Sequence, residues 1–268
     1  MHNIMNFYEL LFVIVLLSAL LNSILGFGFA IIFSPVFLTF LEPKIVVQVS
    51  GLLTLFVVLI LSIFLFKFCN VRLLKKAILY SLPAYPLGYF ILSELNSISI
   101  KLIAFFVVFL TIKSIFSKEF KKVYAKENIT LSTYPKDKKY IKFLINYMAP
   151  FFAGFLNLTL AMPGPAIVGY FRNFDLDQKV LKSTLASFMT ISYFILMGIQ
   201  FFFIGISTET FSIAKLFIIP VLAGLFLGFL FRNKVSEKFY LIITIVILIT
   251  ILVSLSINIF KNLSNLNF

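Results

Sequence analysis

Charged residues are scarce in this sequence. Of its 268 residues only 12% are charged, while 61% are hydrophobic and the mean hydropathy is +1.09. A soluble domain contains about 25% charged and about 45–50% apolar residues. A fold in water would lack the polar side chains needed to cover its surface, which indicates that lipid is the solvent. We predict an all-α integral membrane protein with about 7–8 membrane segments, since one spanning helix takes about 20 apolar residues.

Residues that carry catalytic and redox chemistry are also rare. Cys69 is the only cysteine and His2 the only histidine, which excludes an intrachain disulfide and a cysteine metal site. The sequence has no HExxH, GxSxG or CxxC motif and no phosphate-binding loop. No Asp, Glu, His or Lys stands in the middle of an apolar run, where proton-coupled carriers usually place ionisable groups. We therefore predict no catalytic residue, no metal ligand and no cofactor; a membrane enzyme is the least favoured alternative.

Basic residues outnumber acidic ones, with a formal net charge of +13. In a soluble protein this excess would indicate a nucleic-acid partner. Here the Lys and Arg residues lie between apolar runs, so they indicate orientation in the membrane instead. We expect the lipid bilayer and a small anion as partners and no nucleic acid, with assembly into a homo-oligomer left open.

Eight apolar runs follow one another along the chain. They lie at about 10–41, 45–66, 77–93, 98–116, 143–171, 180–206, 211–231 and 239–260. A basic, polar stretch separates the fourth run from the fifth. We therefore predict a first membrane repeat at 1–116, a cytoplasmic linker at 117–142 and a second membrane repeat at 143–268.

The two predicted repeats resemble each other along their length. Asn22 corresponds to Asn157 at an offset of 135, and Pro83 corresponds to Pro220 at an offset of 137. A two-residue insertion reconciles the two offsets. Internal repeats of this kind are typical of transporters.

Two topologies are compatible with these runs. If every run crosses the membrane, 15 of the Lys and Arg residues lie inside and eight outside. If 10–41 and 143–171 are hairpins that enter and leave on one side, 19 lie inside; those outside are Lys44, Lys101, Lys215 and Lys261. The positive-inside rule favours the second topology. Each repeat is then a broken helical hairpin plus three transmembrane helices, and the repeats are inverted.

Helix-breaking residues interrupt both hairpin runs, at GFGFA (26–30) and AMPGP (161–165). Matched breaks in two repeats are the best sequence sign of a transporter's binding site, and helix N-termini at such breaks favour an anion. The candidate substrate-binding residues are Asn22, Gly26, Gly28, Ser34, Gln48, Asn157, Thr159, Pro163, Gly164, Pro165, Arg172 and Thr184. For a single Ser or Thr, a bond to its own helix is the competing interpretation; for Arg172 it is membrane orientation alone.

Both interrupted segments resemble one known family. GFGFAIIFSPVFLTFLEPKIVVQVSGLL at 26–53 and GFLNLTLAMPGPAIVGYFRNFDLDQKVLKSTLASF at 154–188 are similar to the two hairpins of the sulfite exporter TauE/SafE family, also called the TSUP permeases. Ala161 departs from the pattern, where glycine is common, and the glycine run after Gly28 is short. The resemblance implies a multi-pass permease of the bacterial inner membrane for small sulfur-containing anions such as sulfite or organosulfonates, with export as the expected direction. A channel, or a transporter of another small anion or metabolite, is the alternative.

Overall fold

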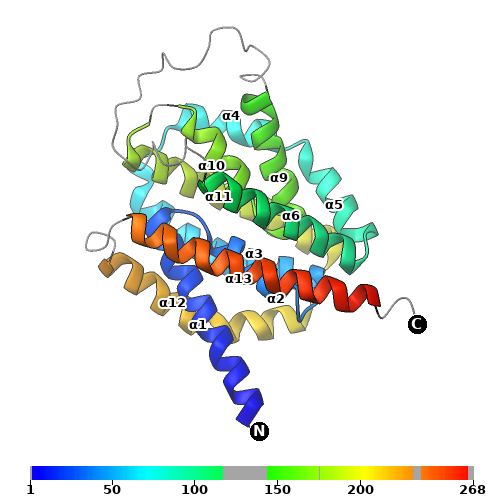
Figure 1. Cartoon of the computed structure of the whole chain (residues 1–268). Helices are drawn as coiled ribbons and strands as arrows, with labels where there is room; N and C mark the ends of the chain where they lie inside the picture. Colours follow the sequence, from blue (N-terminus) through cyan, green and yellow to red (C-terminus); the bar gives the residue numbers. More distant parts are fainter. Residues whose placement is uncertain (1, 117–143, 175, 232–236, 265–268) are drawn as a thin grey trace.

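The computed structural model describes residues 2–116, 144–174, 176–231 and 237–264, and the predicted linker 117–142 lies outside them. Its described elements are helical throughout, as predicted (Figure 1). The first group of helices is α1 (His2–Leu25), α2 (Phe29–Phe37), α3 (Pro43–Leu65), the short turn η1 (Phe66–Phe68), α4 (Val71–Ser81), α5 (Ala84–Glu94) and α6 (Ser97–Phe116). The second is η3 (Leu144–Met148), α9 (Ala149–Leu160), α10 (Gly164–Arg172), α11 (Gln178–Ile199), η4 (Gln200–Ile204), α12 (Thr208–Phe231) and α13 (Glu237–Ser264).

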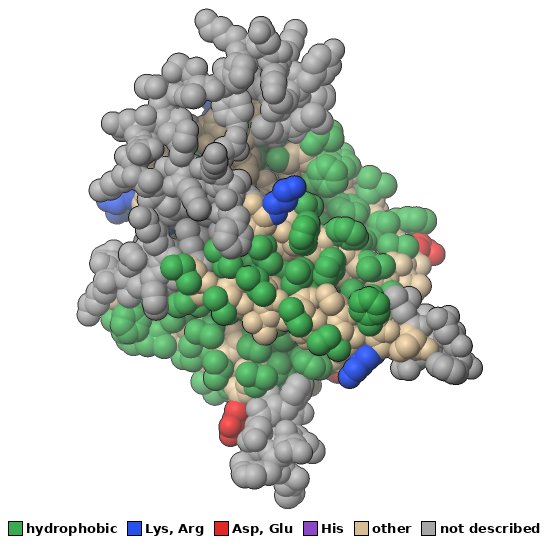
Figure 2. Space-filling view, in the orientation of Figure 1, with side chains coloured by type: hydrophobic (Ala, Val, Ile, Leu, Met, Phe, Trp, Pro, Cys, Tyr) green, Lys and Arg blue, Asp and Glu red, His purple; other side chains and the backbone are tan. Residues whose placement is uncertain are grey.

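The chain is an all-α membrane protein by the length and surface of these helices. Within the described ranges, four helical stretches are long and apolar enough to cross a bilayer: Pro43–Phe68, Gln178–Ile204, Thr208–Phe231 and Ile242–Asn262. Large apolar side chains are exposed, among them Phe202 (78% exposed), Phe260 (74%) and Ile219 (73%). Figure 2 shows hydrophobic side chains over most of the described face, with few charged ones among them. Water would penalise such a surface, whereas lipid matches it.

Both hairpin runs are broken where the glycines and prolines predict. The run 10–41 becomes α1 and α2, separated at residues 26–28, and the run 143–171 becomes α9 and α10, separated at residues 161–163. Within each pair the two helices pack on one another. Phe29 and Gly164, the first residues of α2 and α10, are 135 positions apart, and the starts of α4 and α12 are 137 apart, which are the offsets seen in the sequence.

One expected span differs. The run 77–93 is not a single helix, because α4 ends at Ser81 and α5 begins at Ala84. Pro83 lies between them and has no N–H to offer the carbonyl of Leu79, so the chain bends there. Pro220, its counterpart, lies inside the continuous helix α12.

Corresponding helices make corresponding contacts. Helix α1 packs on α12 as α9 packs on α5, while α3 packs on α11 and α6 on α13. The two groups therefore interlock: in Figure 1, α4 and α5 lie with α9 to α11, whereas α12 and α13 lie with α1 and α2. This is the pattern that two copies of one unit make about a two-fold axis.

Contacts at the ends of α3 and α11 decide between the two topologies. The Nζ of Lys179 lies 5.9 Å from the ring centroid of Phe68, and the N–H of Asn70 donates to Thr184 Oγ1 at 3.0 Å. These contacts join the basic segments 67–76 and 172–182 at one end of the molecule. At the other end, Lys44 Nζ donates to the carbonyl of Ile204 at 3.2 Å. The count in which every run crosses puts 67–76 and 172–182 on opposite sides, so it is wrong; the hairpin topology agrees with these contacts.

Glycines let α1 and α12 approach closely. A Cβ on Gly224 would collide with the carbonyl oxygen of Leu16 and lie 2.8 Å from the Cβ of Ala19; one on Gly228 would lie 2.8 Å from Ser23 Oγ. Small residues four positions apart allow this kind of packing in membranes. Gly224 and Gly228 therefore form a packing surface between α12 and α1.

We predict that Gly224→Ala lowers the free energy of unfolding by about 1–3 kcal/mol, because a backbone carbonyl has no room to move aside. The measurement is unfolding in detergent followed by circular dichroism. Gly198→Ala is the matched control: Gly198 lies within α11 with nothing within 4 Å of the added Cβ, so helix propensity alone should make it neutral or stabilising by up to about 1 kcal/mol. Equal stability of the two variants would contradict the packing role.

Candidate functional site

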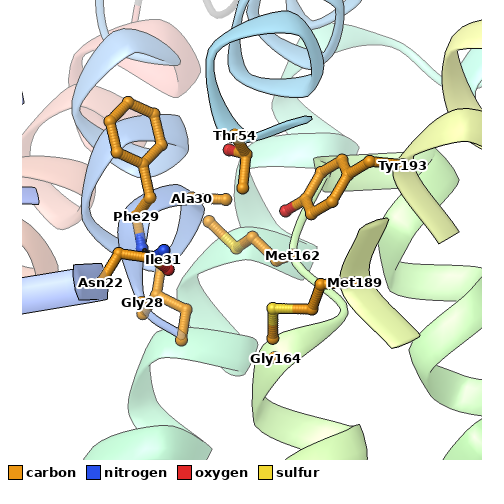
Figure 3. Close-up of a pocket in the computed structure, with 10 residues that line it drawn as sticks. All are labelled: Asn22, Gly28, Phe29, Ala30, Ile31, Thr54, Met162, Gly164, Met189 and Tyr193. Atoms are coloured by element: carbon orange, nitrogen blue, oxygen red, sulfur yellow. Dashed lines mark hydrogen bonds between the residues drawn. The ribbon is translucent and has the colours of Figure 1, made fainter. Parts of the chain in front are cut away.

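A small cavity lies where the two broken hairpins meet. Its volume is about 10 Å³, room for about one water molecule. It is lined by Asn22, Gly28, Phe29, Ala30, Ile31, Thr54, Met162, Gly164, Met189 and Tyr193 (Figure 3). Thr54 and Met189 are halfway along α3 and α11, so the cavity is level with the middle of the two central helices. The tips of the two broken hairpins therefore meet at this cavity.

Asn22 organises the first tip. Its carbonyl accepts the N–H of Gly26 at 2.8 Å, and its side-chain Oδ1 accepts the N–H of Phe29 at 3.3 Å. Gly26 and Gly28 have φ angles of 82° and 123°, which glycine tolerates best. These two left-handed residues turn the chain from α1 into α2. The first residues of α2 then line the cavity, where their N–H groups have no partner within the helix.

The second tip is built differently. The N–H of Ala161 donates to the carbonyl of Asn157 at 2.8 Å, and Ala161 is left-handed at φ 56°. Its own carbonyl accepts a bond from Tyr193 Oη at 2.6 Å. In Pro163-Gly164-Pro165 only Gly164 carries an N–H, so α10 offers fewer backbone donors than α2.

Gly164 is needed for space rather than for a positive φ. Gly164 is not among the described residues with positive φ, so its backbone conformation does not require a glycine. A Cβ on it would lie 3.4 Å from Ile31 Cδ1 and from Met189 Cε. A side chain larger than alanine would therefore fill the cavity.

Two buried polar groups at the cavity have no hydrogen-bond partner. Asn22 Nδ2 and Thr54 Oγ1 belong to side chains that are 0% and 1% exposed. Thr54 is unlike Thr159, Thr184 and Thr190, whose hydroxyls donate to carbonyls of their own helices. A buried polar group without a partner is costly unless a ligand or water meets it. No Asp, Glu, His, Lys or Arg is among the residues lining the cavity.

Asn157 does not face this cavity. Its Nδ2 donates to the Ser192 carbonyl at 2.8 Å, to Ser192 Oγ at 2.9 Å and to Tyr85 Oη at 3.3 Å. The residues that correspond to Ser192 and Tyr85 around Asn22 are Val57 and Leu222, both apolar. The two equivalent asparagines thus differ: the amide of Asn157 joins three helices, and that of Asn22 is left open.

The structure places the other candidates outside the cavity. Ser34 donates to Ser50 Oγ at 2.9 Å within the core. Gln48 Nε2 donates to Gln200 Oε1 at 3.1 Å and to the Gly205 carbonyl at 2.8 Å. Thr159 bonds within its own helix, as the competing interpretation has it, and Arg172 is partly exposed in the last turn of α10.

Hydrogen bonds hold α3 and α11 to neighbouring segments at both ends of the pair. At one end Gln48 binds η4 and the following loop, and Thr210 Oγ1 donates to Gln48 Oε1 at 2.7 Å. At the basic end Ser183 Oγ donates to the Leu65 carbonyl at 2.7 Å, and Thr184 accepts the N–H of Asn70. Lys182, the residue before Ser183, lies near the first tip, since its Cβ would be 3.7 Å from a Cβ on Gly26.

Of the ten residues that line the cavity, the sequence candidates include Asn22, Gly28 and Gly164. The other seven were not among the candidates: Phe29, Ala30, Ile31, Thr54, Met162, Met189 and Tyr193. Met189 had a usable signal, since it stands 135 positions after Thr54. Tyr193 had a weaker one, as a polar aromatic residue inside an apolar run. Within the described ranges no three His, Cys, Asp or Glu side chains gather as a metal site would need.

Broken helices whose tips enclose a cavity with buried, unpartnered donors define a class: polytopic membrane transporters. The sequence profile of the sulfite exporter TauE/SafE family matches residues 11–255. The chain therefore belongs to the sulfite exporter TauE/SafE family, which implies a multi-pass membrane transporter of sulfite or related anions. No curated protein and no solved structure matches the chain.

We predict that Asn157→Leu lowers the free energy of unfolding by about 1–3 kcal/mol, because buried polar groups of Tyr85 and Ser192 lose a partner. Thermal unfolding in detergent measures the loss. Asn96→Leu is the control, since Asn96 is exposed and accepts the N–H of Ser99 at the start of α6; its loss is that of a helix cap, about 1 kcal/mol. A wild-type melting temperature for Asn157→Leu would contradict the structural role.

Proposed function

We propose that this chain carries small sulfur-containing anions, such as sulfite or organosulfonates, across the membrane through the cavity between the two tips. The observation that carries the proposal is the open Nδ2 of Asn22 beside the N-terminus of α2, both buried midway along the central helices. Family membership supports the same substrate class.

Binding of the anion rests on neutral donors. The N–H groups at the start of α2 and the partial positive charge of the helix N-terminus favour an anion without a buried Lys or Arg. Asn22 Nδ2 and Thr54 Oγ1 add two side-chain donors. Asn22 has a second task, because its Oδ1 holds the N–H of Phe29 and so orients the helix start toward the ligand.

The small cavity and the hydrogen bonds that join both ends of the α3–α11 pair support a carrier rather than a channel. The cavity holds about one water, and both ends of the α3–α11 pair are joined by hydrogen bonds. An anion enters when the tips separate and one end opens. In a carrier the Gln48 contacts and the Ser183 contacts release in turn, so each transport cycle moves a bound anion and the flux saturates.

Orientation follows from charge. We place the basic end, with 67–76 and 172–182, in the cytoplasm of a bacterium, and the chain in its inner membrane as two inverted repeats. Lys182 and Arg172 then draw anions toward the first tip from the cytoplasm. The inside-negative potential favours exit of an anion by about 2.3 kcal/mol per charge per 100 mV, so export needs no coupling ion.

Purified protein in proteoliposomes tests the proposal. Sulfite flux should saturate, follow an imposed membrane potential and continue when a pH gradient is collapsed at fixed potential. Flux that rises linearly with concentration would indicate a channel. Absence of flux for sulfite and for a panel of organosulfonates would refute the proposed substrate class.

We predict that Asn22→Asp lowers sulfite flux at least about tenfold while leaving the melting temperature within a few degrees. Aspartate keeps the oxygen that accepts the Phe29 N–H but replaces the open donor by an acceptor, which a bound anion repels; one lost charge-assisted hydrogen bond is worth about 1.5–3 kcal/mol. Asn96→Asp is the control, because it makes the same chemical change at an exposed cap. Wild-type flux in Asn22→Asp would show that this amide does not meet the substrate.

A further inference from the structure

The two walls of the cavity differ in chemistry. On the first-hairpin side lie Asn22 Nδ2 and the N–H groups at the start of α2, with Thr54 above them (Figure 3). Facing them are the thioether side chains of Met162 and Met189. Tyr193 donates its hydroxyl hydrogen to the Ala161 carbonyl. The N–H groups of Ala161 and Met162 are bonded to backbone carbonyls of α9, and in Pro163-Gly164-Pro165 only Gly164 carries an N–H. The side-chain donors without a partner therefore lie on one wall.

The asymmetry coincides with the internal repeat. Met189 stands where the other repeat has Thr54, and Asn157, the counterpart of Asn22, has its amide bound to Ser192 and Tyr85. Had both repeats kept their donors open, they would surround a ligand from opposite sides. Instead one wall donates and the other is soft and apolar.

We propose that this cavity selects anions with three oxygens on one face and a non-oxygen corner opposite, and rejects anions that carry an oxygen at all four corners. This inference rests on the proposed function. Sulfite has a lone pair at its fourth corner, thiosulfate a sulfur and an organosulfonate a carbon. Each turns its oxygens to Asn22, Thr54 and α2, and its remaining corner to Met162 and Met189.

Sulfate and phosphate carry an oxygen at every corner. One of these oxygens would face the methionines, where it loses its water and gains no donor. An unpaired buried acceptor costs about 1–3 kcal/mol, or about 5-fold to 150-fold in binding. Met189 and Met162 are thus specificity-determining residues, acting by the lack of a donor.

Thiosulfate and sulfate are the matched probes, since both are dianions and differ in one corner atom. Equilibrium binding of each to the purified full chain in detergent, at equal ionic strength, gives the ratio of dissociation constants. We expect thiosulfate to bind at least about tenfold more tightly than sulfate. A ratio within about threefold would overturn the inference, as would tighter binding of sulfate.

A variant locates the preference. Met189→Thr places on the apolar wall the hydroxyl that Thr54 has on the other. The variant should bind sulfate more tightly, so that the ratio of the sulfate to the thiosulfate dissociation constant shrinks at least about fivefold. Met189→Leu, which keeps the wall apolar at similar volume, should leave the ratio unchanged. The role of this residue would be refuted if Met189→Thr kept the wild-type preference for thiosulfate, or if Met189→Leu lost that preference.

Met162→Gln provides a second variant with the same expectation, should Met189→Thr not fold. The proposed function fails in a distinguishable way. If the wild-type chain binds neither sulfite nor thiosulfate, and transports neither, the proposed function is wrong; if it transports sulfite but binds sulfate equally well, only the selection rule is wrong.

Discussion

A backbone that leaves the helix inside a membrane must satisfy its N–H and C=O groups without water, and this constraint shapes the centre of the molecule. Lipid offers no partner for these groups, so each break is buried among other helices. At the first break Asn22 binds the N–H of Phe29, and at the second Tyr193 binds the carbonyl of Ala161. These bonds fix where α2 and α10 begin, and so where a ligand meets a helix N-terminus.

The same constraint explains why the surrounding helices pack so closely. Helix α1 lies against α12 through Gly224 and Gly228, and α9 lies against the bend after α4, where a Cβ on Gly154 would collide with the Ser81 carbonyl. Apolar side chains alone give helices little reason to associate in lipid, since lipid is equally apolar. Close backbone contact and buried polar bonds such as Asn157 to Ser192 provide the attraction.

Repetition and divergence have separate roles in this fold. The repeated pattern of helix starts and contacts places two breaks face to face. Divergence at a few positions then gives the two sides different tasks: Asn22 remains open where Asn157 is bound, and Thr54 faces a methionine at the equivalent position. A site between two related units becomes asymmetric by such substitutions without any change of fold.

The sequence by itself determined the membrane class, the two broken hairpins and the family resemblance. Hydrophobic length, glycine and proline act locally, so composition predicts the membrane class, and GFGFA and AMPGP predict the two helix breaks. The distribution of Lys and Arg favoured the hairpin topology over the one in which every run crosses. Asn22, Gly28 and Gly164, which line the cavity, were also among the residues that the sequence predicted for the site. Which polar residue faces the cavity was decided only by the tertiary structure. Asn157 is engaged by residues 35 and 72 positions away, and Gln48 by residues more than 150 positions away. The helix is interrupted at Pro83, whereas its counterpart Pro220 lies inside a continuous helix. The local sequence did not predict this difference either. Side-chain partners depend on which helices pack together, and a local sequence pattern does not determine that packing.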